Sequence, residues 1–445
     1  MKILFASLGC DKNLVDTEVM LGYLYEKGYS FTDNEEEADI VVVNTCGFIH
    51  DAKEESVQTI LEMAELKKEG KIKALLVTGC LAQRYKEEIQ TEIEEVDAIL
   101  GTTAIDHIVE AVEEALGGNG MNHLDDINKI PPLDQKRILT TGGHFAYLKI
   151  AEGCNKKCTY CAIPKMRGKY RSVPIDNLVQ EAQSLVERGT KELILVAQET
   201  TVYGIDIYGK KELPKLLRQL CKIEGLEWIR ILYCYPEEIT EELIAVMKEE
   251  DKICNYLDIP IQHASNRILQ LMGRRTNQEQ LRHNITMMRE AIPDMCLRTT
   301  FITGFPDETE EDHQEVLAFI DEMEFDRLGV FTYSREEDTI AGEMEEQIEE
   351  GIKVERQEEI MELQQEIAFE KAELTIGTRL TAMIEGKLEE DGVYLARTYK
   401  DAPNVDGFLF LHTQNTLMTG DFVQVIITGS HEYDLIGELI DESSQ

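Results

Sequence analysis

Residues 152–161 have the sequence Glu-Gly-Cys-Asn-Lys-Lys-Cys-Thr-Tyr-Cys, so Cys154, Cys158 and Cys161 form a C-x3-C-x2-C pattern. Three thiolates this close in sequence do not complete the four-thiolate shell of a structural zinc ion or of a buried electron-transfer cluster. They can hold a cubane [4Fe–4S] cluster in which one iron stays open to a small molecule. A zinc site completed by a distant Cys or His is the alternative, but spacing and position favour the cluster.

The cysteine pattern follows the first of six strand candidates that alternate with helical patterns. The candidates are Phe145–Ala151, Glu192–Glu199, Trp228–Tyr235, Tyr256–His263, Cys296–Phe305 and Arg327–Ser334. Six such units predict a partial (β/α)6 barrel, short of the eight units that close a full one. The cysteines therefore lie at the carboxyl end of a barrel strand, where the active sites of barrels gather.

An acidic helical stretch, Glu336–Glu370, follows the last barrel strand. One face of it carries the apolar residues Ile352, Ile360, Leu363 and Ile367. We expect a solvated helix that braces the barrel.

The residues before the barrel predict a separate α/β domain. Lys2–Gly9, Asp39–Cys46 and Lys73–Cys80 are apolar and partly β-branched, as buried parallel strands are, and Ala98–Thr102 is a fourth candidate. Helical patterns separate them, which predicts a doubly wound parallel sheet over residues 1–120. A linker over 121–143 then leads to the barrel domain, residues 144–371.

Three further cysteines follow the strands of this first domain. Cys10, Cys46 and Cys80 occur in Leu-Gly-Cys, Asn-Thr-Cys-Gly and Thr-Gly-Cys, each at a strand end. In a doubly wound sheet these ends share one crevice, the usual ligand site. The alternative is that small apolar cysteines simply pack there. Three at equivalent positions favour a second metal cluster held by three thiolates. Cys221, Cys234, Cys254 and Cys296 show no ligand spacing and are predicted to be buried thiols.

The last segment, residues 374–442, consists of short strand-like runs separated by Gly, Asp and Asn, which predicts a small antiparallel β-barrel. From residue 375 onward it contains twelve acids and four bases, a net charge of −8.

Charge and composition limit the function classes. The chain has 445 residues, with 86 Asp and Glu against 45 Lys and Arg, and a formal net charge of −41. Such a field repels phosphate backbones and attracts basic partners, so direct nucleic-acid binding is not expected. No apolar run reaches the length of a membrane span. The first residues predict a strand rather than a signal peptide, which indicates a cytoplasmic protein.

Taken together, these motifs resemble the radical S-adenosylmethionine (SAM) enzymes, specifically the methylthiotransferase family and its RimO branch, which modifies a small-subunit ribosomal protein. The phrases that carry the resemblance are Ser7-Leu-Gly-Cys-Asp-Lys-Asn-Leu-Val-Asp16, Cys161-Ala-Ile-Pro-Lys-Met-Arg-Gly168, Gln198-Glu-Thr-Thr201, Asp258-Ile-Pro-Ile-Gln-His263 and Arg298-Thr-Thr-Phe-Ile-Thr-Gly-Phe-Pro306.

The resemblance implies two [4Fe–4S] clusters and SAM as cofactors. It assigns Cys154, Cys158 and Cys161 to the cluster that binds SAM and yields a 5′-deoxyadenosyl radical, and Cys10, Cys46 and Cys80 to a second cluster that presents or supplies sulfur. A second SAM would provide the methyl group. The target would be the β-carbon of one aspartate in ribosomal protein S12, with an electron donor as a further partner. Candidate SAM contacts at strand ends are Gln198, Gln262, Arg298 and Gly304.

The terminal β-barrel resembles a TRAM domain, which binds RNA in related enzymes. A domain that binds RNA needs Lys and Arg side chains to contact the phosphates. The net charge of −8 on the terminal β-barrel therefore favours a basic ribosomal protein over tRNA as the substrate. A tRNA adenosine methylthiotransferase and a non-catalytic iron–sulfur scaffold are the alternatives. Asp338 and Ile340 stand where family members often have Gly and Pro, and Asn404 stands where an acid is usual. Asp tolerates left-handed backbone, so we expect the turn at 338 to be kept.

Overall fold

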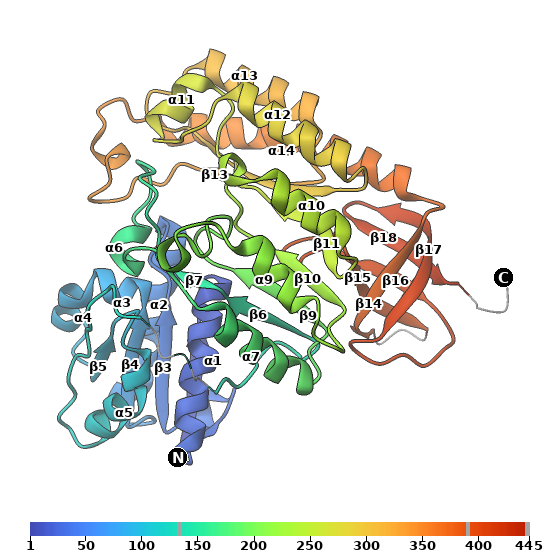
Figure 1. Cartoon of the computed structure of the whole chain (residues 1–445). Helices are drawn as coiled ribbons and strands as arrows, with labels where there is room; N and C mark the ends of the chain where they lie inside the picture. The colour runs from blue at the N-terminus through green and yellow to red at the C-terminus, as the bar shows by residue number, and fades with distance from the viewer. Residues whose placement is uncertain (131–132, 134–135, 389–391, 441–445) are drawn as a thin grey trace.

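The computed structural model describes residues 1–130, 133, 136–388 and 392–440. It places a parallel α/β sheet, a six-stranded partial barrel and a small closed β-barrel in chain order (Figure 1). The expected fold class is confirmed. Residues 131–132 and 134–135 of the expected linker, and 389–391 and 441–442 of the expected last domain, lie outside the described residues.

The first domain is a parallel sheet with the strand order β2-β1-β3-β4-β5. Helices α1 and α5 pack on one face, and α2, α3 and α4 pack on the other. Strands β3 and β4 are buried along their whole length, which explains their continuous apolar runs. The elements are β1 Lys2–Ser7, α1 Asp11–Glu26, β2 Ser30–Phe31, β3 Ile40–Thr45, α2 His50–Lys68, β4 Ala74–Gly79, α3 Cys80–Arg84, α4 Lys86–Glu92, β5 Ala98–Leu100 and α5 Ile108–Leu116, with short 3-10 turns at Glu35–Glu37 and Ile105–His107.

The second domain is an open parallel sheet with the order β6-β9-β10-β11-β12-β13, which follows the chain order. Helices cover its outer face and form the largest apolar core of the molecule. Its strands are β6 Phe145–Lys149, β9 Glu192–Val196, β10 Trp228–Ile231, β11 Ile253–Asp258, β12 Cys296–Thr303 and β13 Arg327–Thr332.

The helices of this domain are α6 Ile163–Arg167, α7 Ile175–Glu187, α8 Ile205–Tyr208, α9 Leu213–Leu220, α10 Glu241–Glu249, α11 Asn266–Leu271, α12 Gln278–Ala291, α13 Glu310–Met323 and α14 Glu350–Thr375, with 3-10 turns at Pro236–Glu238 and Ala341–Glu343. A two-stranded antiparallel pair, β7 Ala151–Glu152 and β8 Arg171–Ser172, encloses the loop that carries the C-x3-C-x2-C cysteines.

The long acidic helix is shorter than the sequence predicts. Helix α14 begins at Glu350, and residues 336–349 form a loop with one 3-10 turn. Glu336 is buried in ion pairs with Lys53 and Arg84 of the first domain, which draws the loop away from a helical path. Asp338 has a φ of +58°, so the turn expected there is kept, and it is incompatible with a helix.

Helix α14 braces the barrel as expected. Gln357 and Gln364 donate side-chain hydrogen bonds to the carbonyl oxygens of Val330 and Phe325, at 2.7 and 2.8 Å, beside the edge strand β13. Ile360 and Ile367 are buried there. Ile352 is exposed, so the apolar face is shorter than predicted.

Among residues 379–388 and 392–440, five strands close into a barrel with the order β14-β15-β16-β18-β17. Their pairs are antiparallel except β16–β18, which is parallel. The strands are β14 Arg379–Lys387, β15 Val393–Thr398, β16 Leu409–His412, β17 Phe422–His431 and β18 Asp434–Leu439.

A buried ion cluster fastens this barrel to the (β/α) domain. Glu192 of β9 accepts hydrogen bonds from Arg230 at 2.8 Å and from Arg397 of β15 at 2.6 Å, and all three side chains are at most 1% exposed. Asn404 has a φ of +64° in the loop after β15, a conformation that Asn adopts more easily than most residues.

Candidate active site

Cys46 and Cys80 directly follow β3 and β4, Cys10 follows β1 after Leu8 and Gly9, and the structure brings the three together. Gly9 has a φ of +86°, and a Cβ atom on it would lie 2.7 Å from Cβ and 3.0 Å from Sγ of Cys46. Sγ of Cys80 lies 3.8 Å from Oδ1 of Asn13, in the first turn of the helix that starts after Cys10. The strand order reverses between β1 and β3, so the three thiols share the crevice expected at that point.

The chemistry of these thiols suits a metal cluster. Burial raises the pKa of the Cys80 thiol to about 11, although Arg167 lowers it, and burial also raises the pKa of Cys46. Such thiols are protonated at neutral pH unless a cation binds them as thiolates. Three thiols at one end of a sheet fit a cubane that keeps one iron free of protein ligands.

Cys154, Cys158 and Cys161 lie in the loop between β7 and α6. Lys156 N donates to Sγ of Cys154 at 3.4 Å, and Sγ of Cys158 lies 3.5 Å from the hydroxyl of Tyr235. Burial raises the pKa of Cys154 to about 11, and burial together with the neighbouring Cys158 raises that of Cys161. The loop is held in place because Cys154 N donates to Gly168 O at 3.1 Å.

The two cysteine sets account for six of the ten thiols, and the other four lie apart from them. Within the described residues these four are buried, as the sequence predicts. Cys221 and Cys234 belong to the helix-covered core, and Cys254 and Cys296 lie on the inner face of the sheet. Neither set therefore gains a fourth cysteine ligand in the described part of the chain, which fits two clusters of the open kind.

A buried network of charged side chains extends from the first cysteine set toward the second, and Arg167 is its centre. Its Nε donates to Sγ of Cys80 at 3.2 Å, and its Nη1 donates to Asp16 at 2.6 Å and to Glu152 at 3.1 Å. Its Nη2 donates to Oδ1 of Asn13. Asn13 and Asp16 belong to α1, whereas Glu152 lies two residues before Cys154. The network therefore contacts Cys80 of the first set directly and ends on Glu152, two residues before the second set begins.

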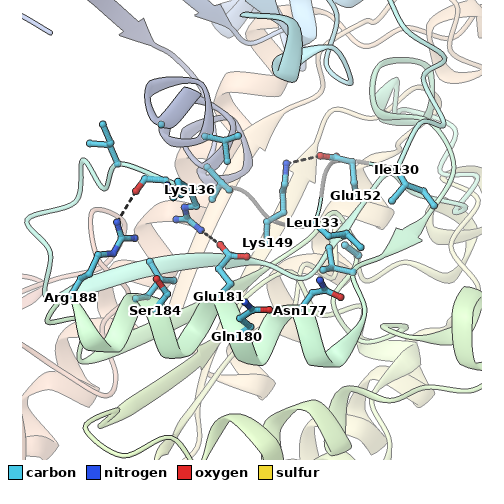
Figure 2. Close-up of a pocket in the computed structure, with 18 of the residues that line it drawn as sticks. Ile130, Leu133, Lys136, Lys149, Glu152, Asn177, Gln180, Glu181, Ser184 and Arg188 are labelled. Carbon is cyan, nitrogen blue, oxygen red and sulfur yellow. Dashed lines mark hydrogen bonds and ion pairs between the residues drawn. The ribbon is translucent and has the colours of Figure 1, made fainter. Parts of the chain in front are cut away.

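A cavity of about 590 Å³ lies between α1, α7 and the chain that connects the first two domains (Figure 2). Asn177, Gln180, Glu181 and Ser184 line it from α7. Its described lining includes Lys149 and Glu152, which form an ion pair at 3.0 Å, but none of the six clustered cysteines. The cavity therefore adjoins the network rather than the thiols.

The four candidate SAM contacts lie in different surroundings. Gln198 donates to Oε1 of Glu152 at 2.7 Å and so joins the network. Gln262 has a φ of +76°, and its buried Oε1 accepts no hydrogen bond from the described residues. These two positions support a ligand role without assigning the ligand.

Arg298 and Gly304 have other neighbours. Arg298 donates to Asp258 at 3.2 Å and lies 3.5 Å from Asp406, which belongs to the last domain. Gly304 has a φ of +70°, and a Cβ atom there would meet the side chain of Lys353 on α14. Both contacts are with protein, so the role of these two residues toward SAM stays a prediction.

Sequence reasoning passed over Glu199, the neighbour of Gln198. Its carboxylate is 1% exposed, its Oε2 has no hydrogen-bond donor among the described residues, and Lys156 Nζ lies 3.6 Å away. Burial raises the pKa of Glu199 to about 7. A buried carboxylate oxygen that lacks a hydrogen-bond donor can bind an ammonium group. The position of Glu199 at a barrel strand end was the available signal.

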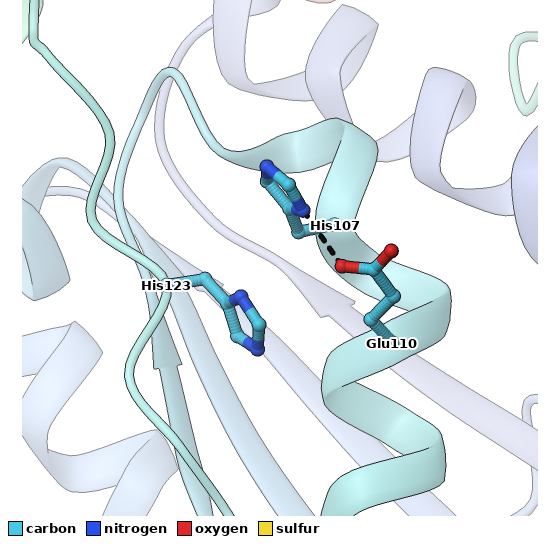
Figure 3. A group of neighbouring side chains, drawn as sticks. All are labelled: His107, Glu110 and His123. Atoms are coloured by element: carbon cyan, nitrogen blue, oxygen red, sulfur yellow. Dashed lines mark hydrogen bonds and ion pairs between the residues drawn. The ribbon is translucent and has the colours of Figure 1, made fainter.

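One further group of ligating side chains lies on the first domain (Figure 3). His107 Nδ1 is 2.9 Å from Glu110, and the ring of His123 stacks on that of His107 with centroids 5.4 Å apart. Lys129 pairs with Asp106 at 2.7 Å and with Asp125 at 2.5 Å beside them. These pairs join residues 123–129 to the start of α5, and Lys129 already supplies a cation, so a structural role explains the group.

In the described part of the chain, none of the helices is both long and apolar enough to cross a membrane.

Comparison with known families divides the chain into three matches. Residues 2–101 match the uncharacterized protein family UPF0004, residues 148–320 match the radical SAM superfamily, and residues 376–440 match the TRAM domain.

Whole-chain relatives share one name. The chain is 62% identical over 437 residues to the ribosomal protein uS12 methylthiotransferase RimO of Lachnoclostridium phytofermentans, covering 98% of this chain and 99% of that relative. It is 49% identical over 442 residues to the protein of the same name from Clostridioides difficile, covering 99% of each.

Solved structures support the fold. The radical SAM methyltransferase TsrM from Kitasatospora setae, solved with cobalamin and a [4Fe–4S] cluster bound, aligns with a TM-score of 0.55 at 14% identity over 77% of each chain. The cobalamin-dependent radical SAM enzyme OxsB aligns with a TM-score of 0.52 at 14% identity, over 77% of this chain and 54% of that one.

Proposed function

Because this chain belongs to the RimO family of ribosomal protein uS12 methylthiotransferases, we propose that it attaches a methylthio group to the β-carbon of one aspartate of that protein. It is a radical SAM enzyme whose cofactors are two [4Fe–4S] clusters and SAM. When bound, these cofactors supply one-electron cleavage of SAM to a 5′-deoxyadenosyl radical, a sulfur atom and a methyl group, chemistry that acid–base side chains cannot provide at an aliphatic C–H bond.

The two cysteine sets are assigned to two different clusters. We assign Cys154, Cys158 and Cys161 to the cluster that binds SAM, because their loop lies at the carboxyl end of the first barrel strand. Cys10, Cys46 and Cys80 are assigned to the sulfur-handling cluster in the crevice of the first domain. Each set offers three thiols, which leaves one iron of each cluster open to a ligand that is not protein.

Glu199 is our candidate for holding the amino group of SAM. Its buried Oε2 accepts no hydrogen bond from the described residues and forms an ion pair at 3.6 Å with Lys156, which lies within the cysteine loop. Gln198 and Gln262, with buried amide oxygens, are candidates for further polar contacts, and Arg298 and Gly304 are retained as weaker ones.

The substrate is a basic protein, and charge supports that partner. A chain of net charge −41 attracts a Lys- and Arg-rich ribosomal protein and repels the phosphates of bulk RNA, so direct nucleic-acid binding is not part of this proposal. An electron donor is required to reduce the clusters. We place the reaction in the cytosol, where small ribosomal subunits are.

The observation that carries the proposal is a buried network in which Arg167 contacts Cys80 of the first set and Glu152, two residues before Cys154 of the second. The test is transfer of labelled methyl from SAM by reconstituted enzyme to purified uS12 or to bulk tRNA. We expect label in uS12 and 5′-deoxyadenosine in solution. Label in tRNA alone would assign the chain to adenosine methylthiolation, and absence of 5′-deoxyadenosine would leave only a scaffold or electron carrier.

A further inference from the structure

Arg167 occupies a position that the C-x3-C-x2-C pattern does not explain. It ends α6, six residues after Cys161, and its side chain is 3% exposed. A buried guanidinium is costly unless its donors are satisfied. Here Nε, Nη1 and Nη2 all find acceptors, and one of these acceptors is the sulfur of Cys80 in the other domain.

The acceptors around Arg167 are themselves fixed. The amide nitrogen of Asn13 donates to the carbonyl oxygens of Leu8 and Thr45, at 3.0 and 2.9 Å, where β1 and β3 end. Its Oδ1 is thereby turned toward Arg167. Through Asn13, the guanidinium of Arg167 is therefore held relative to the ends of β1 and β3. It contacts Cys80, at the end of β4, directly.

The same guanidinium contacts the barrel. Glu152 receives Arg167 at 3.1 Å and Lys149 at 3.0 Å on one oxygen, and Gln198 at 2.7 Å on the other. Asp16 receives Arg167 at 2.6 Å and also pairs with Lys149. The positive charges of Arg167 and Lys149 balance the negative charges of Asp16 and Glu152. The network therefore carries no net charge while Arg167 is present.

We propose that Arg167 is a positioning residue for the sulfur-transfer half of the reaction, which fixes Cys80 relative to the barrel cysteines and donates a hydrogen bond to its sulfur. The inference rests on the proposed function for its role in transfer, but its effect on the first-domain cluster can be measured without any turnover. The planar guanidinium donates hydrogen bonds in fixed directions, so its acceptors can lie in one arrangement only. An apolar contact is not directional and does not fix the relative position of two domains in this way.

The electronic consequence has a definite sign. Reduction adds negative charge to a cluster, and a cationic donor at a ligand sulfur stabilises that charge, so it raises the reduction potential. Without Arg167, Asp16 and Glu152 face the cluster with only Lys149 to balance them. The potential of the first-domain cluster therefore falls when the guanidinium is removed.

The experiment compares Arg167→Gln and Arg167→Lys with Arg137→Gln in the full-length, anaerobically reconstituted protein. Arg137 is a matched control because it is buried, pairs with Glu18 of α1 and Glu181 of α7 at 2.6 Å, and so spans the same two domains without a cysteine contact among the described residues. Iron per chain, the molar ratio of 5′-deoxyadenosine to methylthiolated uS12, and the midpoint potential are measured. The potential is determined in a background in which Cys154, Cys158 and Cys161 are Ala, so that only the first-domain cluster contributes.

We expect both Arg167 variants to raise the ratio of 5′-deoxyadenosine to methylthiolated uS12 by about 10- to 100-fold. Loss of a hydrogen-bond partner of a metal ligand lowers activity by about that factor. We also expect Arg167→Gln to lower the midpoint potential of the first-domain cluster. Selective loss of that cluster in Arg167→Gln, with both clusters kept in Arg137→Gln, supports the proposal equally. An unchanged potential and ratio, or the same change in Arg137→Gln, overturns it. If the parent chain does not modify uS12, the proposed function fails, and the potential still decides the role of Arg167.

Discussion

Gly79 is the residue whose replacement should separate the two halves of the site. It ends β4, one residue before Cys80, with a φ of +96° and a ψ of −160°. That combination lies in a region that only glycine occupies readily. We predict that Gly79→Ala empties the first-domain site and leaves the barrel site intact.

The magnitude has two parts. Holding Ala in this backbone region costs about 1–3 kcal/mol. A Cβ atom at Gly79 would also lie 2.8 Å from Thr45 N and close to its carbonyl oxygen, and these are backbone atoms that cannot rotate away. Overpacking of that kind costs a further 1–3 kcal/mol or so. Relief requires the turn before Cys80 to move, which displaces a ligand.

The assay is iron content and 5′-deoxyadenosine formation after anaerobic reconstitution. We expect iron to fall from about eight to about four atoms per chain, with cleavage of SAM retained and methylthiolation of uS12 lost. Gly70→Ala is the control, because Gly70 has a φ of +71° but no atom within 4 Å of the added Cβ. It should lose about 1–2 kcal/mol of stability and keep both clusters. Full iron loading in Gly79→Ala would show that the strand-end geometry does not control the first site.

Three further changes test other parts of the structure. Cys46→Ala should halve the iron and stop sulfur insertion while 5′-deoxyadenosine still forms; unchanged iron and methylthiolation would remove the first-domain cluster from the mechanism. Because the pKa of Glu199 is raised to about 7, its carboxylate ionises as pH rises, so SAM should bind more tightly at pH 8 than at pH 6 by calorimetry; Glu199→Gln should bind weakly with a flat profile, and a parent-like profile would exclude the carboxylate. Although burial raises the pKa of Glu192, Arg397 and Arg230 lower it more, so its contribution to stability is present above the unfolded pKa and is lost as pH falls through the lower folded value. Glu192→Gln leaves two buried guanidinium groups under-paired and should cost about 3–5 kcal/mol in unfolding experiments, whereas the exposed Glu366→Gln should cost almost nothing.

The sequence predicted those features that depend on local pattern. Runs such as Ile40–Thr45 and Ala74–Gly79 are apolar on both sides because helices cover both faces of the sheet, so they identify parallel strands from composition alone. Six cysteines followed from strand ends and from spacing. In the structure Cys46 and Cys80 directly follow β3 and β4, and Cys154, Cys158 and Cys161 share one loop, while the role of the six as cluster ligands stays a prediction.

The features that the sequence did not predict depend on contacts between domains. The segment after Ser334 has helical composition, but Glu336 forms ion pairs with Lys53 and Arg84, which are 283 and 252 positions away in sequence, and these pairs hold the segment as a loop. Arg298 was expected near SAM as a strand-end residue, yet it is the third residue of β12 and lies 3.5 Å from Asp406 of the last domain. Glu199 adjoins the predicted Gln198, and the pattern of a strand end does not distinguish which of two successive side chains faces the cysteine loop.

The charged character of the interface around Arg167 follows from what the two domains must do. A hydrophobic interface would hold the domains together at lower desolvation cost, since buried ion pairs are often no more stabilising than well-packed apolar groups. It would not, however, specify one relative position of Cys80 and the barrel loop, and transfer between two reaction centres is sensitive to displacements of about 1 Å. Arg167 meets four acceptors from α1, α3 and β7 that agree in only one arrangement. In a chain whose two reactive centres lie in separate domains, a network of directional hydrogen bonds therefore fixes the relative position of the centres better than additional buried apolar area would.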